Sequence, residues 1–236
     1  MASWPYHLVK FLSWLILRFG LGLEVRGQSH VPAAGAFIAA SNHVSYLDPL
    51  VVGVACPRRL CFMARSTLYA HPLMRGFLRA MQVIPLQRGE ADVWAVREAT
   101  RQLTRGQPVA IFPEGGRQVS GILGQAKRGV GLVAALAEVP IVPVFVHGTS
   151  KALPPGSRWP RRAKIQVAFG PQIAYTGERF SATSAPSSAA GTIVRADSSH
   201  RVSVHRSMRH QALADAVTQS WRRLKEEVEQ VRPTSS

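Results

Sequence analysis

Short apolar runs alternate with stretches of helical periodicity through the middle of the chain, and this alternation constrains the fold most strongly. The apolar runs predict strands at Ala36–Ser41, Leu60–Ala64, Val83–Leu86, Val109–Pro113, Ile141–Val146 and Ile165–Phe169. Helical spacing predicts helices at Tyr46–Ala55, Pro72–Met81, Asp92–Leu103 and Val130–Ala137. Asp92 is a candidate N-cap and Gly106 a candidate stop. The pattern is typical of an α/β domain with a mostly parallel central sheet, flanked by helices and buried on both faces.

Four segments of different character divide the chain. Residues 1–25 are expected to form an amphipathic helix, and residues 26–180 the α/β domain. Residues 181–208 are rich in Ser, Ala and Thr without a repeating apolar face, and we interpret them as a flexible insertion. Residues 209–236 are expected to pack on the domain as a helix. Its apolar stripe consists of Leu213, Val217, Trp221, Leu224 and Val228.

The apolar N-terminal segment carries Lys10 and Arg18, and its uncharged run is far shorter than the ~20 residues that a membrane span needs. On a helical wheel Lys10, Trp14 and Arg18 share one side with His7, and the aliphatic residues occupy the other. We expect a helix that lies in a membrane interface with its basic side toward the headgroups. Packing on the domain's own core is the alternative. A signal peptide is disfavoured because no small-residue cleavage site follows.

The charge of the chain indicates anionic partners. Its 236 residues are enough for one domain with appendages, and 29 basic residues, mostly arginine, oppose 13 acidic ones for a net charge of +16. Nucleic acid, anionic lipid and phosphorylated substrates are all compatible with this charge. No groove of interleaved basic and aromatic residues is evident, so nucleic acid is not expected. The sequence predicts neither a disulfide nor a metal site at Cys56 and Cys61, and we expect both to be small buried residues.

A histidine and a carboxylate follow the first predicted strand, in the segment from Ser41 to Pro49. His43 has the chemistry of a general base, and Asp48 could fix its tautomer and stabilise the imidazolium. In one straight helix this spacing would hold the two side chains apart, whereas a turn that leads into a helix could bring them together. Alone, such a pair is more often a surface or capping contact than a catalytic one.

Polar groups follow three further predicted strands, and parallel strands present their carboxyl ends at one crevice. Arg65 follows the second strand, Arg88 the third, and Glu114-Gly115-Gly116-Arg117 the fourth. The arginines suit a phosphate, and the two glycines allow close approach to the backbone. No Gly-x-Ser-x-Gly elbow, P-loop or Gly-x-Gly-x-x-Gly occurs. Without a protein nucleophile, the attacking group is expected to be a substrate hydroxyl that His43 activates.

Asn42-His43-x-x-x-x-Asp48 together with Phe112-Pro113-Glu114-Gly115-Gly116-Arg117 resembles the glycerolipid acyltransferase family, in particular the bacterial 1-acylglycerol-3-phosphate acyltransferases. That family's pattern has four blocks. The second ends at Arg88, and the fourth runs from Val139 to Val144 and leads to Gly148-Thr149. Two departures stand out. Gly116 and Gln118 replace a Thr and a Ser in the third block, and Pro85 replaces an aromatic residue in the second.

The resemblance implies transfer of a fatty acyl group from acyl-CoA or acyl carrier protein to a lysophospholipid hydroxyl, without a further cofactor or a metal. His43 and Asp48 would be catalytic. The implied substrate-binding residues are Asn42, Arg88, Glu114, Gly115, Gly116 and Arg117, with the two arginines on the acceptor phosphate. For 1-acylglycerol-3-phosphate the product is phosphatidic acid. A backbone N–H near the helix start after Asn42 is the expected oxyanion donor.

Such an enzyme is expected at a membrane lipid surface, on the cytoplasmic face of the bacterial inner membrane. Lys151–Lys164, basic and with Trp159, is a candidate second contact with anionic lipid or an acidic carrier protein. Two alternatives stay open at this point. One is an acyltransferase for another lysolipid, such as a lyso-aminolipid, because the third block is altered. The other is a non-catalytic basic protein that binds membrane or nucleic acid.

Overall fold

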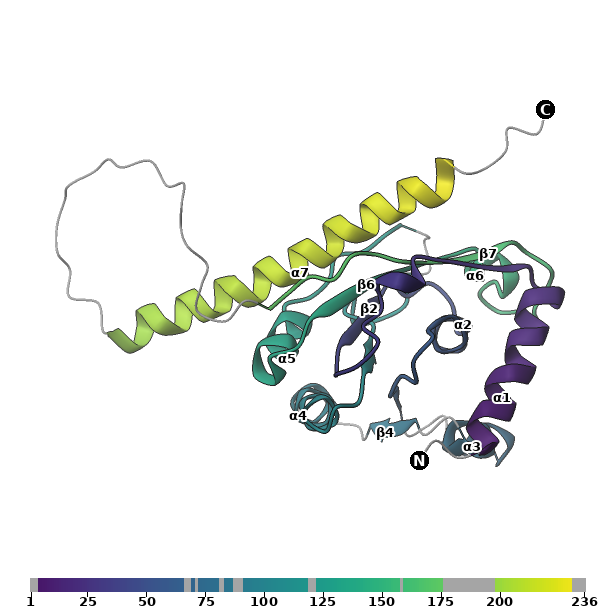
Figure 1. The fold of residues 1–236 in the computed structure, drawn as a ribbon, viewed down its shortest axis with the longest axis horizontal. Coiled ribbons are helices and arrows are strands. Elements are labelled where there is room, and N and C mark those ends of the chain that lie inside the picture. Colours follow the sequence, from purple (N-terminus) through teal and green to yellow (C-terminus); the bar gives the residue numbers. More distant parts are fainter. Residues whose placement is uncertain are drawn as a thin grey trace.

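A computed structural model describes residues 4–65, 69–70, 72–80, 83–86, 91–118, 122–157, 159–175 and 198–230. A five-stranded sheet lies between two layers of helices (Figure 1). Its strands are β1 (Leu23–Arg26), β2 (Ile38–Ser41), β5 (Val109–Ile111), β6 (Ile141–His147) and β7 (Ile165–Phe169). Their order is β1-β7-β6-β2-β5. β3 (Met63–Arg65) and β4 (Ile84–Leu86) form a separate parallel pair, and a parallel bridge between Cys61 and Val109 connects the run before β3 to β5.

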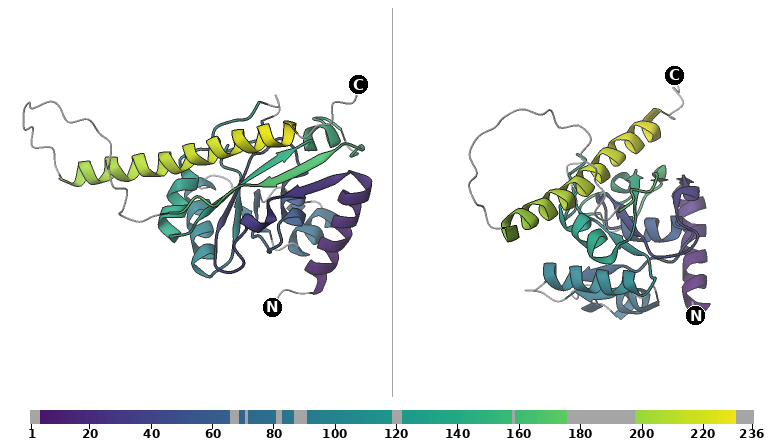
Figure 2. Two further views of the ribbon diagram at one scale, coloured as in Figure 1. Left: turned by 45° about the horizontal axis from the view of Figure 1, so that its top comes forward. Right: turned by 60° about the vertical axis from the view of Figure 1, so that its left-hand side comes forward.

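The helices divide between the two faces of the sheet (Figure 2). They are α1 (Trp4–Leu15), which continues into the π-helical turn η1 (Ile16–Gly20), α2 (Asp48–Ala55), α3 (Pro72–Ala80), α4 (Ala91–Thr104), α5 (Gly129–Ala137), α6 (Thr149–Ala152) and α7 (Ser198–Gln230). A short 3-10 turn, η2, covers Gln28–His30. α1 and α2 lie on one face, and α4, α5 and the long α7 cover the other.

The directions of the strands decide which loops meet. β2 pairs parallel with β5 and β6, whereas β6 pairs antiparallel with β7, and β1 is parallel to β7. The starts of β1 and β7 therefore lie at the same edge of the sheet as the ends of β2 and β6. In register, Glu24 of β1 is opposite Gln166, which is opposite His147. We call this side of the sheet the catalytic edge, after the role predicted for His43, which follows β2. The predicted α/β class with a mostly parallel sheet is confirmed.

Alternating residues of β2 supply both halves of the core, as expected for a strand buried on two faces. Ala39 and Phe37, the residue before β2, pack with α2 on one side, and Ile38 and Ala40 pack with α4, α5 and α7 on the other. Trp221 of α7 is fully buried, and its indole Nε1 donates to the carbonyl of Ala40 over 3.0 Å. α7 thus carries the packing stripe that the sequence predicted.

One glycine permits the closest helix contact in this layer. At Gly131 of α5, an added Cβ would collide with the backbone carbonyl of His210 on α7. The absence of a side chain lets the two helices approach at their backbones, which explains why a glycine stands inside a helix that it otherwise weakens.

Several predicted boundaries differ from the structure, three of them in what they say of the fold. The N-terminal helix ends at Gly20 rather than 25, and Leu23–Arg26 forms the edge strand β1, in which polar residues alternate with apolar ones. α7 begins at Ser198, so residues 198–208 belong to this helix and not to the predicted insertion. Residues 181–197 lie outside the described residues. α4 begins at Ala91, so Asp92 stands inside the helix and is not its cap.

The orientation of α1 also differs from the prediction. Lys10 points toward the domain, where its Nζ donates to the carbonyl of Cys56 over 2.6 Å, and burial lowers the pKa of the Lys10 amine. Tyr6 and Leu17 are buried beside it. The exposed large apolar side chains of α1 and η1 are Leu8, Phe11, Leu12, Trp14, Ile16 and Phe19. We call these six residues the apolar face. None of the helices in the described ranges is long and apolar enough to span a bilayer.

Candidate active site

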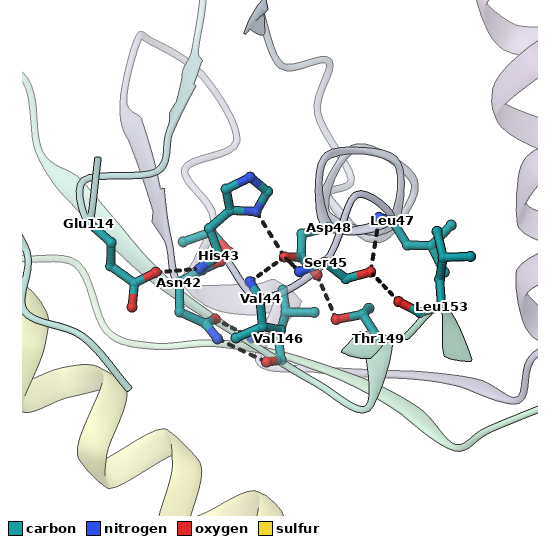
Figure 3. A network of polar contacts seen from close by, with 11 residues as sticks. Asn42, His43, Val44, Ser45, Leu47, Asp48, Glu114, Val146, Thr149 and Leu153 are labelled. Atoms are coloured by element: carbon teal, nitrogen blue, oxygen red, sulfur yellow. Dashed lines mark hydrogen bonds and ion pairs between the residues drawn. The ribbon is translucent and has the colours of Figure 1, made fainter. Parts of the chain in front are cut away.

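The sequence pair His43 and Asp48 meets at the end of β2. His43 lies in the loop that follows the strand, and Asp48 is the first residue of α2. The loop reverses direction between them, so His43 Nδ1 lies 2.9 Å from Asp48 Oδ2 (Figure 3). The carboxylate side chain is fully buried, whereas 17% of the imidazole is exposed. In the described part of the chain, no group bonds to Nε2 of His43. The pair can therefore hold a proton on Nδ1 and accept another at Nε2.

Four donors hold the Asp48 carboxylate in place. Oδ2 accepts the backbone N–H groups of Val44 and Ser45, each over 2.7 Å, in addition to His43. Oδ1 accepts the hydroxyl of Thr149 over 2.6 Å. Such a set compensates the cost of burying an ionised carboxyl group, which would be large without partners. The charge that faces the imidazole is thus fixed in position.

The side chain of Asn42, which the sequence predicted to bind substrate, bonds to the protein backbone in the structure. Its side-chain amide donates to the carbonyl of Val146 over 3.0 Å, and its side-chain oxygen accepts the N–H of Val146 over 2.7 Å. The residue is buried, so both polar groups are used within the protein. Asn42 extends the β2–β6 pairing beyond the last residue of β2 and thereby fixes the backbone that carries His43.

Glu114 supports the same loop from the opposite side. Its Oε2 accepts the backbone N–H of His43 over 2.7 Å, and its Oε1 accepts that of Gly124 over 2.9 Å. Gln118 adds a backbone bond, from its N–H to the carbonyl of His43. Burial raises the pKa of the Glu114 carboxyl, and the two backbone donors partly oppose this shift. Glu114 therefore connects the third sequence block to the loop from Asn42 to Leu47, which carries His43 and which we call the catalytic loop.

The remaining residues of the third block lie over this loop. The Arg117 guanidinium stacks on the ring of Tyr46, 3.5 Å from its centroid, and Tyr46 belongs to the loop between His43 and Asp48. Phe112 packs its ring against the imidazole of His43, with 4.5 Å between the ring centroids. These contacts bring an arginine to the loop that carries His43 and an aromatic ring to its imidazole.

The two glycines of the block differ in their surroundings. Gly115 has φ +77°, and an added Cβ would collide with the Lys127 side chain, which lies across it. At Gly116 an added Cβ would meet nothing within 4 Å. Lys127 thus places a positive charge beside the third block. Open space remains at Gly116, where the family usually has a threonine.

Two predicted arginines cannot be placed. Arg88 lies outside the described residues, and for Arg65 only the backbone, at the end of β3, is described. Most of the loop cannot supply the expected oxyanion donor. The backbone N–H groups of His43, Val44 and Ser45 already donate to the carboxylates of Glu114 and Asp48. No group of three or more potential metal ligands occurs among the described residues.

Thr149, Phe112, Tyr46 and Lys127 were not predicted as site residues. Gly148-Thr149 after the fourth block offered a signal, since a glycine and a hydroxyl side chain at a strand end are typical of a turn into a site. Cys56 and Cys61 have free thiols, and burial raises the pKa of both, that of Cys61 to about 11. Neither thiol is ionised at neutral pH, so neither is suited to act as a nucleophile.

Comparison with known proteins assigns this arrangement to a family. The profile described as "Acyltransferase" matches residues 22–147, which run from the start of β1 to the end of β6 and include both His43 and Asp48. The chain belongs to the acyltransferase family. Within this acyltransferase, the match covers the strands of the catalytic edge except β7. It also covers the third block, which supplies Glu114 and Arg117.

Relatives of this acyltransferase share a common name. The chain is 33% identical over 138 residues to Arabidopsis thaliana 1-acyl-sn-glycerol-3-phosphate acyltransferase LPAT1, chloroplastic, covering 58% of this chain and 37% of that protein. It is 26% identical to the Bacillus subtilis 1-acyl-sn-glycerol-3-phosphate acyltransferase, covering 66% and 76%. The human alpha form is 33% identical, covering 58% and 51%. The chain thus spans only about a third to a half of the plant and human relatives.

A solved structure has the same fold as this acyltransferase. The 1-acyl-sn-glycerophosphate acyltransferase PlsC from Thermotoga maritima superposes with a TM-score of 0.61 at 22% identity, covering 73% of this chain and 72% of that one. At this identity the similarity supports the α/β architecture, and the chemistry has to be argued from the site itself.

Proposed function

We propose that this protein transfers a fatty acyl group from an acyl thioester to the free hydroxyl of 1-acylglycerol-3-phosphate, which gives phosphatidic acid. The observation that carries the proposal is the His43–Asp48 pair, with Nδ1 bonded to a buried carboxylate and Nε2 left without a partner in the described structure. A base held in this way is suited to take a proton from an alcohol. The names of the relatives supply the acceptor and the product.

In this mechanism, Nε2 of His43 takes the proton of the acceptor hydroxyl as its oxygen attacks the thioester carbonyl. Asp48 stabilises the imidazolium that forms. The tetrahedral intermediate collapses and expels the thiolate, which recovers the proton from His43. No covalent acyl-enzyme is needed, which agrees with the raised thiol pKa values of Cys56 and Cys61. Orientation of the two substrates beside one base is sufficient for a large rate enhancement.

The acceptor phosphate is assigned to Arg117, with Arg88 as a second ligand on the ground of sequence alone. Support for Arg117 comes from its stacking on Tyr46, three residues after His43 in the same loop. Lys127 lies across Gly115 in the same block and adds positive charge. Guanidinium groups bind phosphate through two parallel hydrogen bonds, so these residues suit a phosphomonoester.

Association with a membrane surface is the second part of the proposal. The apolar face leaves Phe11 and Phe19 more than half exposed, at 56% and 67%, which is costly in water and favourable in a bilayer interface. Its location also supports membrane contact. Gly22 lies against the backbone of Ala163 and Lys164, next to the start of β7. The end of η1 is therefore at the catalytic edge, where an acceptor held in a membrane would be presented to His43.

The segment from Lys151 to Lys164 completes this surface. Trp159 is 82% exposed, and Lys151, Arg161 and Arg162 are exposed beside it. The segment connects α6 to β7 at the catalytic edge, so it would face the same bilayer. We propose that it contacts anionic lipid, and that the membrane is the inner membrane on its cytoplasmic side.

A coupled assay tests the reaction. Purified protein receives 1-acylglycerol-3-phosphate with acyl-CoA in one arm and acyl carrier protein thioester in the other, and both thiol release and phosphatidic acid are measured. We expect His43→Ala to abolish both signals while vesicle binding is retained. Near-normal turnover by His43→Ala would overturn the mechanism. A panel of other lysolipids, including lyso-aminolipids, tests the acceptor, and a better substrate in that panel would overturn its identity.

A further inference from the structure

We propose that Thr149 is a positioning residue of the catalytic pair, which acts by holding the Asp48 carboxylate in the one orientation that serves His43. This inference rests on the proposed acyl transfer and assigns a role to the end of the fourth sequence block. In the described structure, Thr149 is fully buried and its hydroxyl bonds to Asp48 and not to His43, so it acts through Asp48.

The two oxygens of Asp48 have separate partners. Oδ2 receives His43 and two backbone N–H groups, all from its own loop. Oδ1 receives only the Thr149 hydroxyl among the described residues, over 2.6 Å (Figure 3). Because the carboxylate is fully buried, loss of this hydroxyl would leave a charged oxygen without a donor. Among the described residues, Thr149 is thus the one hydrogen-bond partner of the carboxylate from outside its own loop, and it fixes the rotation of the carboxylate plane.

The chain is built to deliver this hydroxyl. β6 ends at His147, and Gly148 then adopts φ +86°, in the left-handed region that favours glycine. An added Cβ at Gly148 would collide with the carbonyl of Lys164. The sharp turn that only glycine allows here directs Thr149, the first residue of α6, back over the end of β2. Gly148 therefore provides the turn, and Thr149 provides the hydroxyl that donates to Asp48.

The consequence for chemistry is a fixed tautomer. With Oδ1 held by Thr149, Oδ2 stays opposite Nδ1 of His43, so the imidazole proton remains on Nδ1 and Nε2 remains a base. Without the hydroxyl, the carboxylate can rotate, and its two backbone donors retain Oδ2 for only part of the time. We therefore expect a partial loss of rate and not a collapse of the site.

Two substitutions separate the hydroxyl from the shape of the side chain. Thr149→Val keeps the branched shape and removes the donor, whereas Thr149→Ser keeps the donor. Since a hydrogen bond to a charged group is worth more than a neutral one, we expect Thr149→Val to lower kcat about 10- to 100-fold. The KM values for both substrates should stay within about twofold, and Thr149→Ser should restore kcat to within about threefold.

Thr218 of α7 provides the control. It is also a buried threonine, and its hydroxyl accepts from the N–H of Ala126 and donates to the carbonyl of Ala214, on the face of the sheet opposite to α2. Thr218→Val should lower thermal stability without a change in kcat. The proposal is wrong if Thr149→Val keeps its kcat, if Thr149→Ser is no better than Thr149→Val, or if Thr218→Val lowers kcat equally.

A spectroscopic readout does not depend on turnover. The Nδ1 proton of His43, assigned by its absence in His43→Gln, should give a downfield proton resonance in the wild type. We expect it to shift upfield or broaden in Thr149→Val and to be retained in Thr149→Ser and Thr218→Val. If this pattern holds while no lysophospholipid is acylated, the positioning role stands and the proposed function fails. An unchanged resonance in Thr149→Val overturns the positioning role itself.

Discussion

The guanidinium carbon of Arg117 lies 3.5 Å from the centre of the Tyr46 ring, so the third sequence block rests on the loop of the first. Tyr46 is 67% exposed and lies between His43 and Asp48 in the chain. The loop that carries the base therefore also supports the cation assigned to the acceptor phosphate. In the proposed reaction, this geometric link would set the separation between the reacting hydroxyl and the phosphate of the acceptor.

Substitution of Tyr46 tests this support. A cation stacked on an exposed ring is worth ~0.5–1 kcal/mol, so Tyr46→Ala should raise the KM for 1-acylglycerol-3-phosphate about 2- to 5-fold. Tyr46→Phe keeps the ring and should leave this KM unchanged. Steady-state kinetics with the acceptor varied at saturating acyl-CoA measure both. Equal KM values for the Ala and Phe variants would show that the stacking has no part in binding.

The two glycines of the third block offer a matched pair. Gly115→Ala forces a side chain into the left-handed region and against Lys127, so we expect it to lower the free energy of unfolding by ~1–2 kcal/mol and to weaken acceptor binding. Gly116→Ala places its methyl group in open space, and its effect on stability should stay within about 0.5 kcal/mol. Urea unfolding of both variants measures the difference, and an equal loss in the two contradicts this view of the turn.

The raised pKa of Glu114 predicts a pH dependence of stability. Burial keeps the proton on this carboxyl to a higher pH in the folded state than in the unfolded chain. The folded state therefore binds more protons in that window, and stability is lost as pH rises from the ordinary glutamate range through the folded pKa. Glu114→Gln removes this contribution, so the wild type should lose stability relative to the variant as pH rises. Denaturant unfolding of both proteins across that range measures it; parallel curves would exclude the effect.

The orientation of α1 predicts which substitutions release the protein from membranes. Phe11→Ser with Phe19→Ser removes two exposed rings of the apolar face. Since burial of each ring is worth ~1.5–3 kcal/mol, vesicle partitioning should fall at least about 100-fold. Lys10→Met should leave partitioning unchanged, because Lys10 faces the domain.

A second pair of exposed apolar residues controls for loss of surface hydrophobicity. Val93 of α4 and Leu136 of α5 are 62% and 55% exposed, similar to Phe11 and Phe19. The double variant Val93→Ser with Leu136→Ser should bind vesicles like the wild type. Sedimentation with anionic and zwitterionic vesicles measures all variants. Release by the control pair, or by Lys10→Met, would mean that another surface meets the bilayer.

The sequence predicted the strands of the core well because most of their residues are apolar. Ile165–Phe169 was predicted to the residue, and β6 extends the expected run by one residue, to His147. β1 was missed since Glu24 and Arg26 alternate with apolar residues in only four positions. The start of α7 was missed for a similar reason. Residues 198–208 have no apolar face of their own, and the residues by which α7 packs on the domain lie later in the same helix.

For the site, the sequence supplied residue types but not their partners. His43 and Asp48 were chosen for their chemistry, and their contact depends on a loop whose shape cannot be inferred from spacing. Asn42 and Glu114 were assigned to the substrate, yet their polar groups bond to the backbone of Val146, His43 and Gly124. A polar residue in a motif has the same appearance in a sequence whether it touches a ligand or a neighbouring backbone. Only the fold separates these two uses.

The contacts that hold the catalytic loop come from late in the chain. His43 and Asp48 are five residues apart and can meet as soon as both are synthesised, but Glu114 lies 71 residues after His43, Thr149 lies 101 after Asp48, and Val146 lies 104 after Asn42. Contacts of such long range form only when the intervening segments have folded. During translation the nascent chain would therefore contain His43 long before the residues that hold its loop in place have been synthesised. The order in which the chain emerges therefore delays completion of the site until Thr149 has been synthesised.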